Sequence, residues 1–350
     1  MNHGKVRRLV PVPDAPSEPG VAGSKSGPPA IVARGLTRDF GSLRALDDLT
    51  LEVPRGAIFG FLGRNGAGKT TTIRLLLGLV EPTAGEALVL GHDVVRQSAK
   101  VRKRCGVLLE NPGLAERLTA ADNLDLYGRI WHMRKDMRHA RIAELLKRVS
   151  LWDRRDEPVR DWSRGMKQKL AIARALMHRP SLIFLDEPTA GLDPVASAEL
   201  REDLLRLASR ERVTVFLTTH NLAEAERLCD MVGVVREGRL LSVGSPAEIG
   251  TRHTRPRIRM VGQGFSENVV ELLRAREEVL EVEMGNGHLL VRLADTARVA
   301  PLVSFLVRLG VQIEEVTRIG NTLEDGVLSL FHEEGEAAVP PLRAAGGSDA

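Results

Sequence analysis

The stretch from Gly63 to Thr71, GRNGAGKTT, constrains the fold of this chain more than any other. It fits the pattern G-x-x-x-x-G-K-[ST], and it follows a short apolar run at residues 57–62 that is typical of a buried strand. The residues after it, from Thr72 to Leu79, are typical of a helix. A strand, a glycine-rich loop and a helix in this order predict an α/β fold with a phosphate-binding loop at a strand end.

The residue types in this loop suit a nucleoside triphosphate with bound Mg²⁺. Gly63, Gly66 and Gly68 let backbone amides approach phosphate oxygens with no Cβ in the way. Lys69 supplies a positive charge for the β- and γ-phosphates, and Thr70 offers a hydroxyl to the metal. The following helix directs the positive end of its dipole at the same anion. The alternative is a glycine-rich turn without a ligand, but such a turn would not require Lys-Thr at this register.

Two adjacent carboxylates follow a second buried strand. The run from Leu182 to Leu185 is continuously apolar, as expected for a strand covered on both faces of a parallel sheet, and Asp186 and Glu187 come directly after it. Ligands bind at this edge of open α/β sheets. Asp186 is placed to hold Mg²⁺ directly or through water, and Glu187 is placed to take a proton from an attacking water. An ordinary polar loop is the alternative, and the phosphate loop in the same chain favours catalysis.

Three further side chains have both a functional and a structural interpretation. His220 ends the strand-like run from Val213 and can reach a γ-phosphate at the same sheet edge, or it can be a structural histidine. Phe40 lies at the end of an earlier strand-like segment, where its ring can stack on adenine or pack in the core. Ser163 opens a helix whose start can bind an anion or simply be capped. Spacing alone leaves the choice open for Phe40.

Composition excludes several classes of protein. The longest apolar run, residues 57–63, is far shorter than the roughly 20 residues that a membrane-spanning helix needs. Cys105 and Cys229 are too few and too far apart for a disulfide framework or a thiolate metal site, which fits a reducing compartment. A net charge of +4 over 350 residues does not by itself indicate nucleic-acid binding. We therefore expect a chain that does not span a membrane by itself.

Periodicity and composition divide the chain into four parts. The composition of residues 1–29 and 334–350 predicts that both segments are disordered tails. Residues 30–250 carry the motifs, with a helical subdomain at about 115–165. Residues 251–333 have the order β-α-β-β-α-β, which predicts a small α+β ferredoxin-like domain without a chemical motif.

In this order the motifs resemble those of the nucleotide-binding subunit of ABC transporters, over roughly residues 31–245. In that family GRNGAGKTT is the Walker A motif, residues 182–187 the Walker B motif, Asp193 part of the D-loop and His220 the switch histidine. The resemblance implies a P-loop NTPase cassette with a mixed sheet core, an antiparallel β-subdomain and a helical signature subdomain. It implies contacts with ATP from Phe40, the adenine-stacking residue, and from Gly63, Arg64, Asn65, Gly66, Ala67, Gly68, Lys69, Thr70 and Thr71.

The resemblance also implies a partner chain. Residues 162–166, WSRGM, stand where the family has its LSGGQ signature, although the second glycine and the glutamine are lost. In the family two cassettes sandwich two ATP molecules, and each signature faces the ATP of the opposite chain. A second cassette is therefore required, and we expect a homodimer. The signature residues that would reach the partner's ATP are Ser163, Arg164, Gly165 and Met166.

One further departure affects the metal site. Glu110 occupies the position of the family's Q-loop glutamine. A carboxylate can touch Mg²⁺ or its water, but it cannot donate the amide hydrogen bond. Glu110 therefore joins Thr70 and Asp186 as a candidate metal ligand.

The signature and the closing Asn321-Thr322-Leu323-Glu324-Asp325 resemble the daunorubicin-exporter type of bacterial ATPase. This implies an ATPase at the cytoplasmic face of the cell membrane that energises a separate integral membrane permease. The expected cargo is drug-like, lipid or otherwise amphipathic, and nucleic acid is not an expected partner. A soluble ABC-type ATPase acting on ribosomes or DNA is an alternative, although the second cassette or long coiled coil usual in such proteins does not occur here. A regulatory subunit that uses residues 251–335 as a sensor is another.

Overall fold

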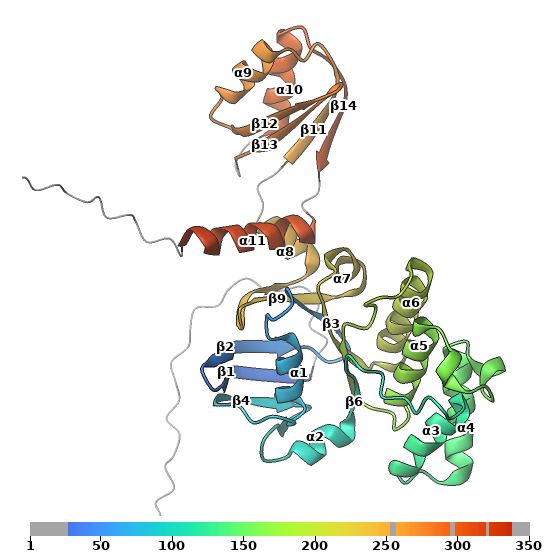
Figure 1. The fold of residues 1–350 in the computed structure, drawn as a ribbon. Helices are drawn as coiled ribbons and strands as arrows, with labels where there is room; N and C mark the ends of the chain where they lie inside the picture. Colours follow the sequence, from blue (N-terminus) through green and yellow to red (C-terminus); the bar gives the residue numbers. More distant parts are fainter. Residues whose placement is uncertain (1–26, 253–256, 295–297, 320–321, 338–350) are drawn as a thin grey trace, which may run out of the picture.

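The computed structural model describes residues 27–252, 257–294, 298–319 and 322–337. The predicted tail at residues 1–29 lies almost wholly outside these ranges, and residues 338–350 lie outside them as well. The described chain forms three sheets with helices around them (Figure 1).

The central sheet is mixed and carries the predicted sheet edge. Its strands β3, β8, β7 and β6 are parallel, β9 runs parallel to β3, and β10 is antiparallel to β9. Every residue of β3, β7 and β8 is buried, because apolar layers cover both faces. The order across the sheet is β10 (Arg239–Gly244), β9 (Met231–Arg236), β3 (Ile58–Leu62), β8 (Thr214–Thr219), β7 (Leu182–Asp186) and β6 (Cys105–Leu108).

Alternate side chains of these strands enter two different cores. In β3, Ile58 and Leu62 belong to the core beside α5 (Arg164–Ala175) and α6 (Pro194–Glu211), whereas Phe59 belongs to the core beside α1 (Lys69–Leu76). Successive side chains of a strand point to opposite faces, so a continuous apolar run satisfies both cores. This explains why the motif strands read as unbroken apolar runs.

A second, antiparallel sheet forms the predicted β-subdomain. Its strands pair only in antiparallel fashion and pack with α1 against one face of the central sheet. Phe40 is the last residue of its strand β1, as the sequence indicates. The order is β2 (Leu43–Val53), β1 (Ile31–Phe40), β4 (Ala84–Val89) and β5 (His92–Asp93), followed in the chain by α2 (Ser98–Arg104).

The predicted helical segment extends away from the central sheet (Figure 1). It holds α3 (Ala120–Ile130), α4 (Lys135–Arg148) and two 3₁₀ turns at Trp152–Arg154 and Val159–Asp161. Thr119 caps α3, because its Oγ1 accepts the Asp122 backbone N–H at 3.1 Å. After β8 the chain adds α7 (Leu222–Leu228) and α8 (Pro246–Arg252).

The chain after α8 forms a separate sheet with its own apolar core, which includes Met260, Leu289 and Leu306. The expected β-α-β-β-α-β order is present, and all strand pairs are antiparallel in the order β12-β13-β11-β14. The elements are β11 (Arg257–Gln263), α9 (Glu267–Arg274), β12 (Val279–Gly285), β13 (His288–Leu293), α10 (Val299–Arg308) and β14 (Gln312–Ile319).

The last described element corrects the predicted division of the chain. Helix α11 (Leu323–Ala337) crosses the expected boundary at residue 333, so the predicted tail at 334–350 is wrong for its first four residues. Leu323, Val327 and Leu330 are buried in the same core as α5 and α6, not in that of β11–β14. Their spacing places them along one helix face, which packs on α7 and α8.

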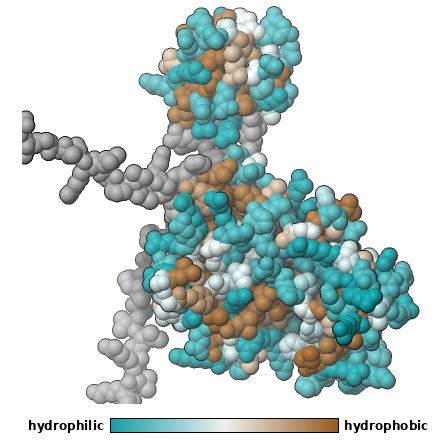
Figure 2. Space-filling model, viewed as in Figure 1, coloured by the Kyte–Doolittle hydropathy of each residue, from teal (hydrophilic) through white to brown (hydrophobic). Residues whose placement is uncertain are grey.

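Hydrophobic residues are scattered over the surface. Figure 2 shows a mostly hydrophilic face on which hydrophobic residues form several separate patches over the cassette and over the β11–β14 unit. Patches of this kind are ordinary for a folded protein surface.

Candidate functional site

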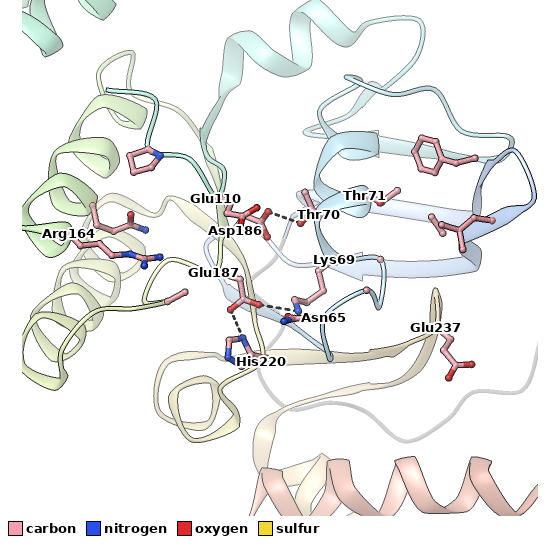
Figure 3. Close-up of a pocket in the computed structure, with 18 of the residues that line it drawn as sticks. Asn65, Lys69, Thr70, Thr71, Glu110, Arg164, Asp186, Glu187, His220 and Glu237 are labelled. Carbon is pink, nitrogen blue, oxygen red and sulfur yellow. Dashed lines mark hydrogen bonds and ion pairs between the residues drawn. The ribbon is translucent and has the colours of Figure 1, made fainter. Parts of the chain in front are cut away.

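The carboxyl ends of three central strands meet at one cavity of about 1010 Å³. The phosphate loop follows β3, Asp186 ends β7, and His220 follows β8 (Figure 3). The parallel order of these strands brings together residues that are far apart in sequence. Predicted site residues that line this cavity are Phe40, Asn65, Gly66, Gly68, Lys69, Thr70, Thr71, Glu110, Arg164, Asp186, Glu187 and His220.

Glycine is required in the phosphate loop partly by packing. Gly68 has a φ of 98° at the N-cap of α1, and a Cβ there would lie 2.6 Å from the Ala45 carbonyl oxygen. A Cβ on Gly63 would lie 2.5 Å from the Val235 carbonyl oxygen. The sequence argument attributed these glycines to phosphate approach alone, whereas the fold adds close backbone contacts with β9 and with β2. Packing therefore requires glycine at these two positions, in addition to the approach of phosphate.

Lys69 is buried and already engages a catalytic candidate. Its Nζ donates to the Gly63 carbonyl at 2.8 Å and lies 3.1 Å from Glu187 Oε1. The other carboxylate oxygen of Glu187 lies 2.9 Å from His220 Nδ1 (Figure 3). Glu187 thus bridges the phosphate-loop lysine and the histidine. The three side chains come from the ends of three different strands.

The backbone fixes the direction of the Glu187 side chain. Glu187 has a φ of 49°, in the left-handed region that a non-glycine residue rarely adopts. Its N–H donates to Thr218, at 3.1 Å to Oγ1 and 3.2 Å to the carbonyl oxygen. Such strained positions persist only where the surroundings hold them, and they cluster at functional sites.

Asp186 and Thr70 have the chemistry of a hard cation site. Thr70 Oγ1 donates to Asp186 Oδ2 at 2.8 Å, and Thr218 Oγ1 donates to Oδ1 at 2.6 Å. A carboxylate and a hydroxyl oxygen are ligands that suit Mg²⁺. Asp186 is buried, and among the described residues its carboxylate accepts side-chain hydrogen bonds only from these two hydroxyls. Glu110 is exposed and lines the same cavity.

Phe40 lies in the cavity and not in the core. Its side chain is 43% exposed, and the guanidinium carbon of Arg38 lies 4.5 Å from the ring centroid. A ring of this exposure can accept a flat ligand on its free face. Leu43 and Arg44, at the start of β2, line the same cavity. Sequence reasoning missed both, although the turn directly after Phe40 was a signal for them.

The signature residues divide between two surroundings. Arg164 lines the cavity and covers Gly191, where a Cβ would lie 2.4 Å from a guanidinium nitrogen. Ser163 instead caps α5, and its Oγ accepts the Met166 N–H at 3.3 Å. Within the described residues, Ser163, Gly165, Met166 and Asp193 do not line the cavity of their own chain.

The remaining predicted residues have structural contacts. Asp193 caps α6, because its Oδ1 accepts the N–H groups of Val195 at 3.0 Å and Ala196 at 2.9 Å. Sequence reasoning also missed Gln168, whose Nε2 donates to the Pro188 carbonyl at 2.7 Å and ties α5 to the loop after Glu187. Other missed cavity residues are Ala45, Pro112, Trp162, Lys167, Ala190 and Glu237.

A phosphate loop, a buried aspartate, a strained glutamate and a histidine meet at the carboxyl ends of the parallel strands of the central sheet, and this arrangement defines a phosphate-loop nucleotide-binding protein. The sequence profile described as ABC transporter matches residues 46–190. The chain belongs to the family of ATP-binding proteins of ABC transporters. It is more than 30% identical to a relative in this family, and the alignment covers almost the whole length of that relative.

Three comparisons support this assignment. The chain is 37% identical over 304 residues to the bacitracin transport ATP-binding protein BcrA of Bacillus licheniformis, covering 86% of this chain and 97% of BcrA. It is 42% identical over 232 residues to the daunorubicin resistance ATP-binding protein DrrA3 of Streptomyces coeruleorubidus, covering 66% of this chain and 73% of DrrA3. The solved structure of cbiO1 from Clostridium perfringens, part of the ABC transporter complex cbiONQ, aligns with a TM-score of 0.61 at 25% identity, over 72% of this chain and 96% of that one.

The predicted fold class and enzyme class are confirmed. The protein has the ABC cassette fold, binds ATP and couples its hydrolysis to transport. Proteins of this family work as cassette dimers that pair with membrane permeases. In the ranges that the structure describes, no helix combines the length and the apolar character that crossing a membrane demands.

Proposed function

We propose that this protein is the ATPase subunit of an exporter, and that it lies at the cytoplasmic face of the membrane through a separate integral membrane permease. The proposed cargo is drug-like, lipid or otherwise amphipathic. Support comes from the names of two relatives, one a bacitracin transport and the other a daunorubicin resistance ATP-binding protein. We propose no nucleic-acid partner, consistent with the net charge of +4.

The observation that carries the enzymatic part is the series of contacts from Lys69 through Glu187 to His220. A γ-phosphate that enters the cavity would draw the Lys69 ammonium away from Glu187, because phosphate is the more highly charged anion. Glu187 would then be free to accept a proton from a water beside that phosphate. His220 would hold the Glu187 carboxylate in place from its other oxygen and contact the γ-phosphate.

The other cavity residues would bind and orient the nucleotide. The loop amides from Gly63 to Thr71 would surround the phosphates at the start of α1, and the Phe40 ring would stack on adenine. Thr70 and Asp186 would hold Mg²⁺, with Glu110 as a further oxygen ligand. When bound, Mg²⁺ supplies charge neutralisation to the phosphates.

The proposed active assembly is a homodimer. Ser163, Arg164, Gly165, Met166 and Asp193 would face the ATP of the partner chain. Support comes from Ser163, which is exposed at the start of α5 and does not line the cavity of its own chain.

We also propose that residues 30–250 form the cassette together with α11, and that β11 to β14 form a separate accessory unit. The two apolar cores support this division, since the buried residues of α11 belong to the core that contains α5 and α6.

The Glu187→Gln variant tests the enzymatic proposal. It should bind ATP like the wild type but hydrolyse it about 10²–10⁴-fold more slowly, because the base is lost. It should also remain as an ATP-bound dimer, detectable by size-exclusion chromatography with ATP. Glu202→Gln, an exposed carboxylate on α6, is the matched control. Hydrolysis at the wild-type rate by Glu187→Gln would exclude Glu187 as the base.

The export proposal has a separate test. Affinity purification from solubilised membranes should recover this protein with an integral membrane protein. Recovery with ribosomes instead, and without a membrane partner, would contradict it.

A further inference from the structure

The loop after β7 and the start of α7 are joined by two parallel contacts. The first is the pair formed by Glu187 and His220, at 2.9 Å. The second is a hydrogen bond of 2.5 Å, in which Thr189 Oγ1 donates to Glu224 Oε2. Thr189 follows Glu187 closely on the loop, and Glu224 follows His220 closely at the start of α7. The loop after β7 and the start of α7 are therefore joined at two points, and one of them is Glu187 itself.

Helix α7 holds Glu224 and His220 as one unit. Asn221 caps α7 by accepting the Glu224 N–H at 3.1 Å, and its own N–H donates to Thr219 Oγ1 at 3.0 Å. Ala225 and Leu228 are buried on the same helix. The cap therefore joins the start of α7, which carries Glu224, to the end of β8, next to His220.

The loop itself is held at successive residues by different elements. Strand β8 holds the Glu187 amide through Thr218, and α5 holds the Pro188 carbonyl through Gln168 at 2.7 Å. Helix α7 holds the next side chain, Thr189, through Glu224. The Thr189–Glu224 contact therefore adds a third attachment of the loop, to a third element.

Stability alone does not account for a carboxylate at position 224. Its side chain is buried, with 6% exposure, and Oε1 has no hydrogen-bond partner among the described residues. Burial raises the pKa of Glu224, while Thr189 and Arg201 act in the opposite direction. An unpartnered buried oxygen costs folding free energy. A second cavity of about 380 Å³ reaches Glu224, Glu187 and His220, so this carboxylate adjoins the reacting groups.

We propose that Glu224 is a positioning residue for ATP hydrolysis. Through Thr189 it holds the loop so that the Glu187 carboxylate stays between Lys69 and His220. Glu224 acts only through this loop and does not touch nucleotide. The inference rests on the proposed role of Glu187 as the base.

The test uses Thr189→Val, which keeps the shape of the side chain and removes the donor. The kcat for ATP should fall roughly 10- to 100-fold, since small misplacements of a catalytic group cost this much. The Kd for ATP should stay within about twofold, because the loop does not bind the phosphates. Thr189→Ser, which restores a hydroxyl, should recover most of the kcat. Ser197→Ala removes a hydroxyl from the same second cavity and is the matched control.

A double-variant cycle separates positioning from a general loss of stability. Thr189→Val combined with Glu224→Leu, a side chain of similar size without a hydrogen-bond acceptor, should be no slower than the worse single variant, because both substitutions remove the same contact. Adding Thr189→Val to Glu187→Gln should not lower the residual rate further. If the variants instead caused a general loss of stability, the effects of the two single substitutions on the rate would add up in the double variant, and the Kd for ATP would rise. This result would overturn the inference.

The outcomes distinguish this inference from the proposed function. Wild-type kcat in Thr189→Val, beside an inactive Glu187→Gln, would overturn the role of Glu224 alone. Wild-type hydrolysis by Glu187→Gln would overturn both the assigned base and the inference. A kcat that Thr189→Ser fails to restore would also overturn the role of Glu224.

Discussion

The Thr70 hydroxyl donates a 2.8 Å hydrogen bond to the Asp186 carboxylate, although 116 residues separate the two in the chain. The contact joins the start of α1 to the end of β7, two elements that meet only because β3 and β7 flank β8 in one parallel sheet. Both groups supply oxygen atoms that would hold Mg²⁺ in the proposed cation site.

Asp186→Asn should remove this cation site while keeping its shape. We expect Mg²⁺-dependent ATP hydrolysis to fall at least about 10²-fold, since the ion's stabilisation of phosphate charge is worth several kcal/mol. Hydrolysis measured over a MgCl₂ titration checks this, with Asp156→Asn, an exposed carboxylate, as the control. An unchanged Mg²⁺ requirement would show that Asp186 is not a ligand.

Phe40→Ala should weaken nucleotide binding. Loss of one stacking contact costs about 0.5–1.5 kcal/mol, which corresponds to roughly a 2- to 13-fold higher Kd. ATP and GTP should be affected alike, because each base presents a π-face. Isothermal titration calorimetry measures the Kd, and Leu79→Ala, exposed but outside the cavity, is the control. Equal affinity in Phe40→Ala and wild type would remove Phe40 from the site.

Leu330→Ala should destabilise the cassette, although the residue lies near the end of the described chain. Leu330 is 6% exposed in the core shared with α5 and α6, and such truncations cost about 2–5 kcal/mol in the free energy of unfolding. Leu328→Ala, at a side chain that is 48% exposed, should change it by less than about 0.5 kcal/mol. Urea denaturation compares them. Equal stability of the two variants would mean that α11 does not belong to the cassette core.

His178 should make stability fall in mild acid. Burial lowers the pKa of His178 below its ordinary value of 6.5, against the raising effect of the Cys105 carbonyl, which accepts from Nε2 at 3.1 Å. As the pH falls below 6.5, the unfolded chain binds this proton before the folded chain does. The free energy of unfolding therefore decreases as the pH drops from 6.5 toward the lower pKa of the folded state.

The variant His178→Phe isolates this effect. It can keep the stacking on Trp131, whose ring centroid lies 4.0 Å away, and it removes the titration. At about pH 8 the free energy of unfolding of the variant should be about 1 kcal/mol lower than that of the wild type, because one hydrogen bond is lost. At about pH 5 this difference should be smaller, because protonation destabilises only the wild type. Urea denaturation at both pH values measures it. A difference that stays constant or grows in acid would contradict the pKa shift.

Local sequence signals predicted the elements that carry the site, because each depends on residues close together in the chain. An apolar run, three glycines and Lys-Thr specify a strand, a loop and a helix around Lys69 with little outside help. The apolar run before Asp186 likewise predicts a strand that is buried on both faces of the sheet. By contrast, sequence reasoning missed α11. Its apolar residues are buried by contacts with α7 and α8, and these contacts cannot be seen from the local sequence.

The sequence by itself determined the family, the fold class and the identity of the residues at the sheet edge, since these follow from local patterns and their order. Only the tertiary structure decided which of them touch. It placed the Phe40 ring in the cavity, set Glu187 between Lys69 and His220, and brought Thr189 to Glu224. The physical reason is that such contacts join side chains from strands and helices distant in sequence, and their geometry depends on how the packed layers align.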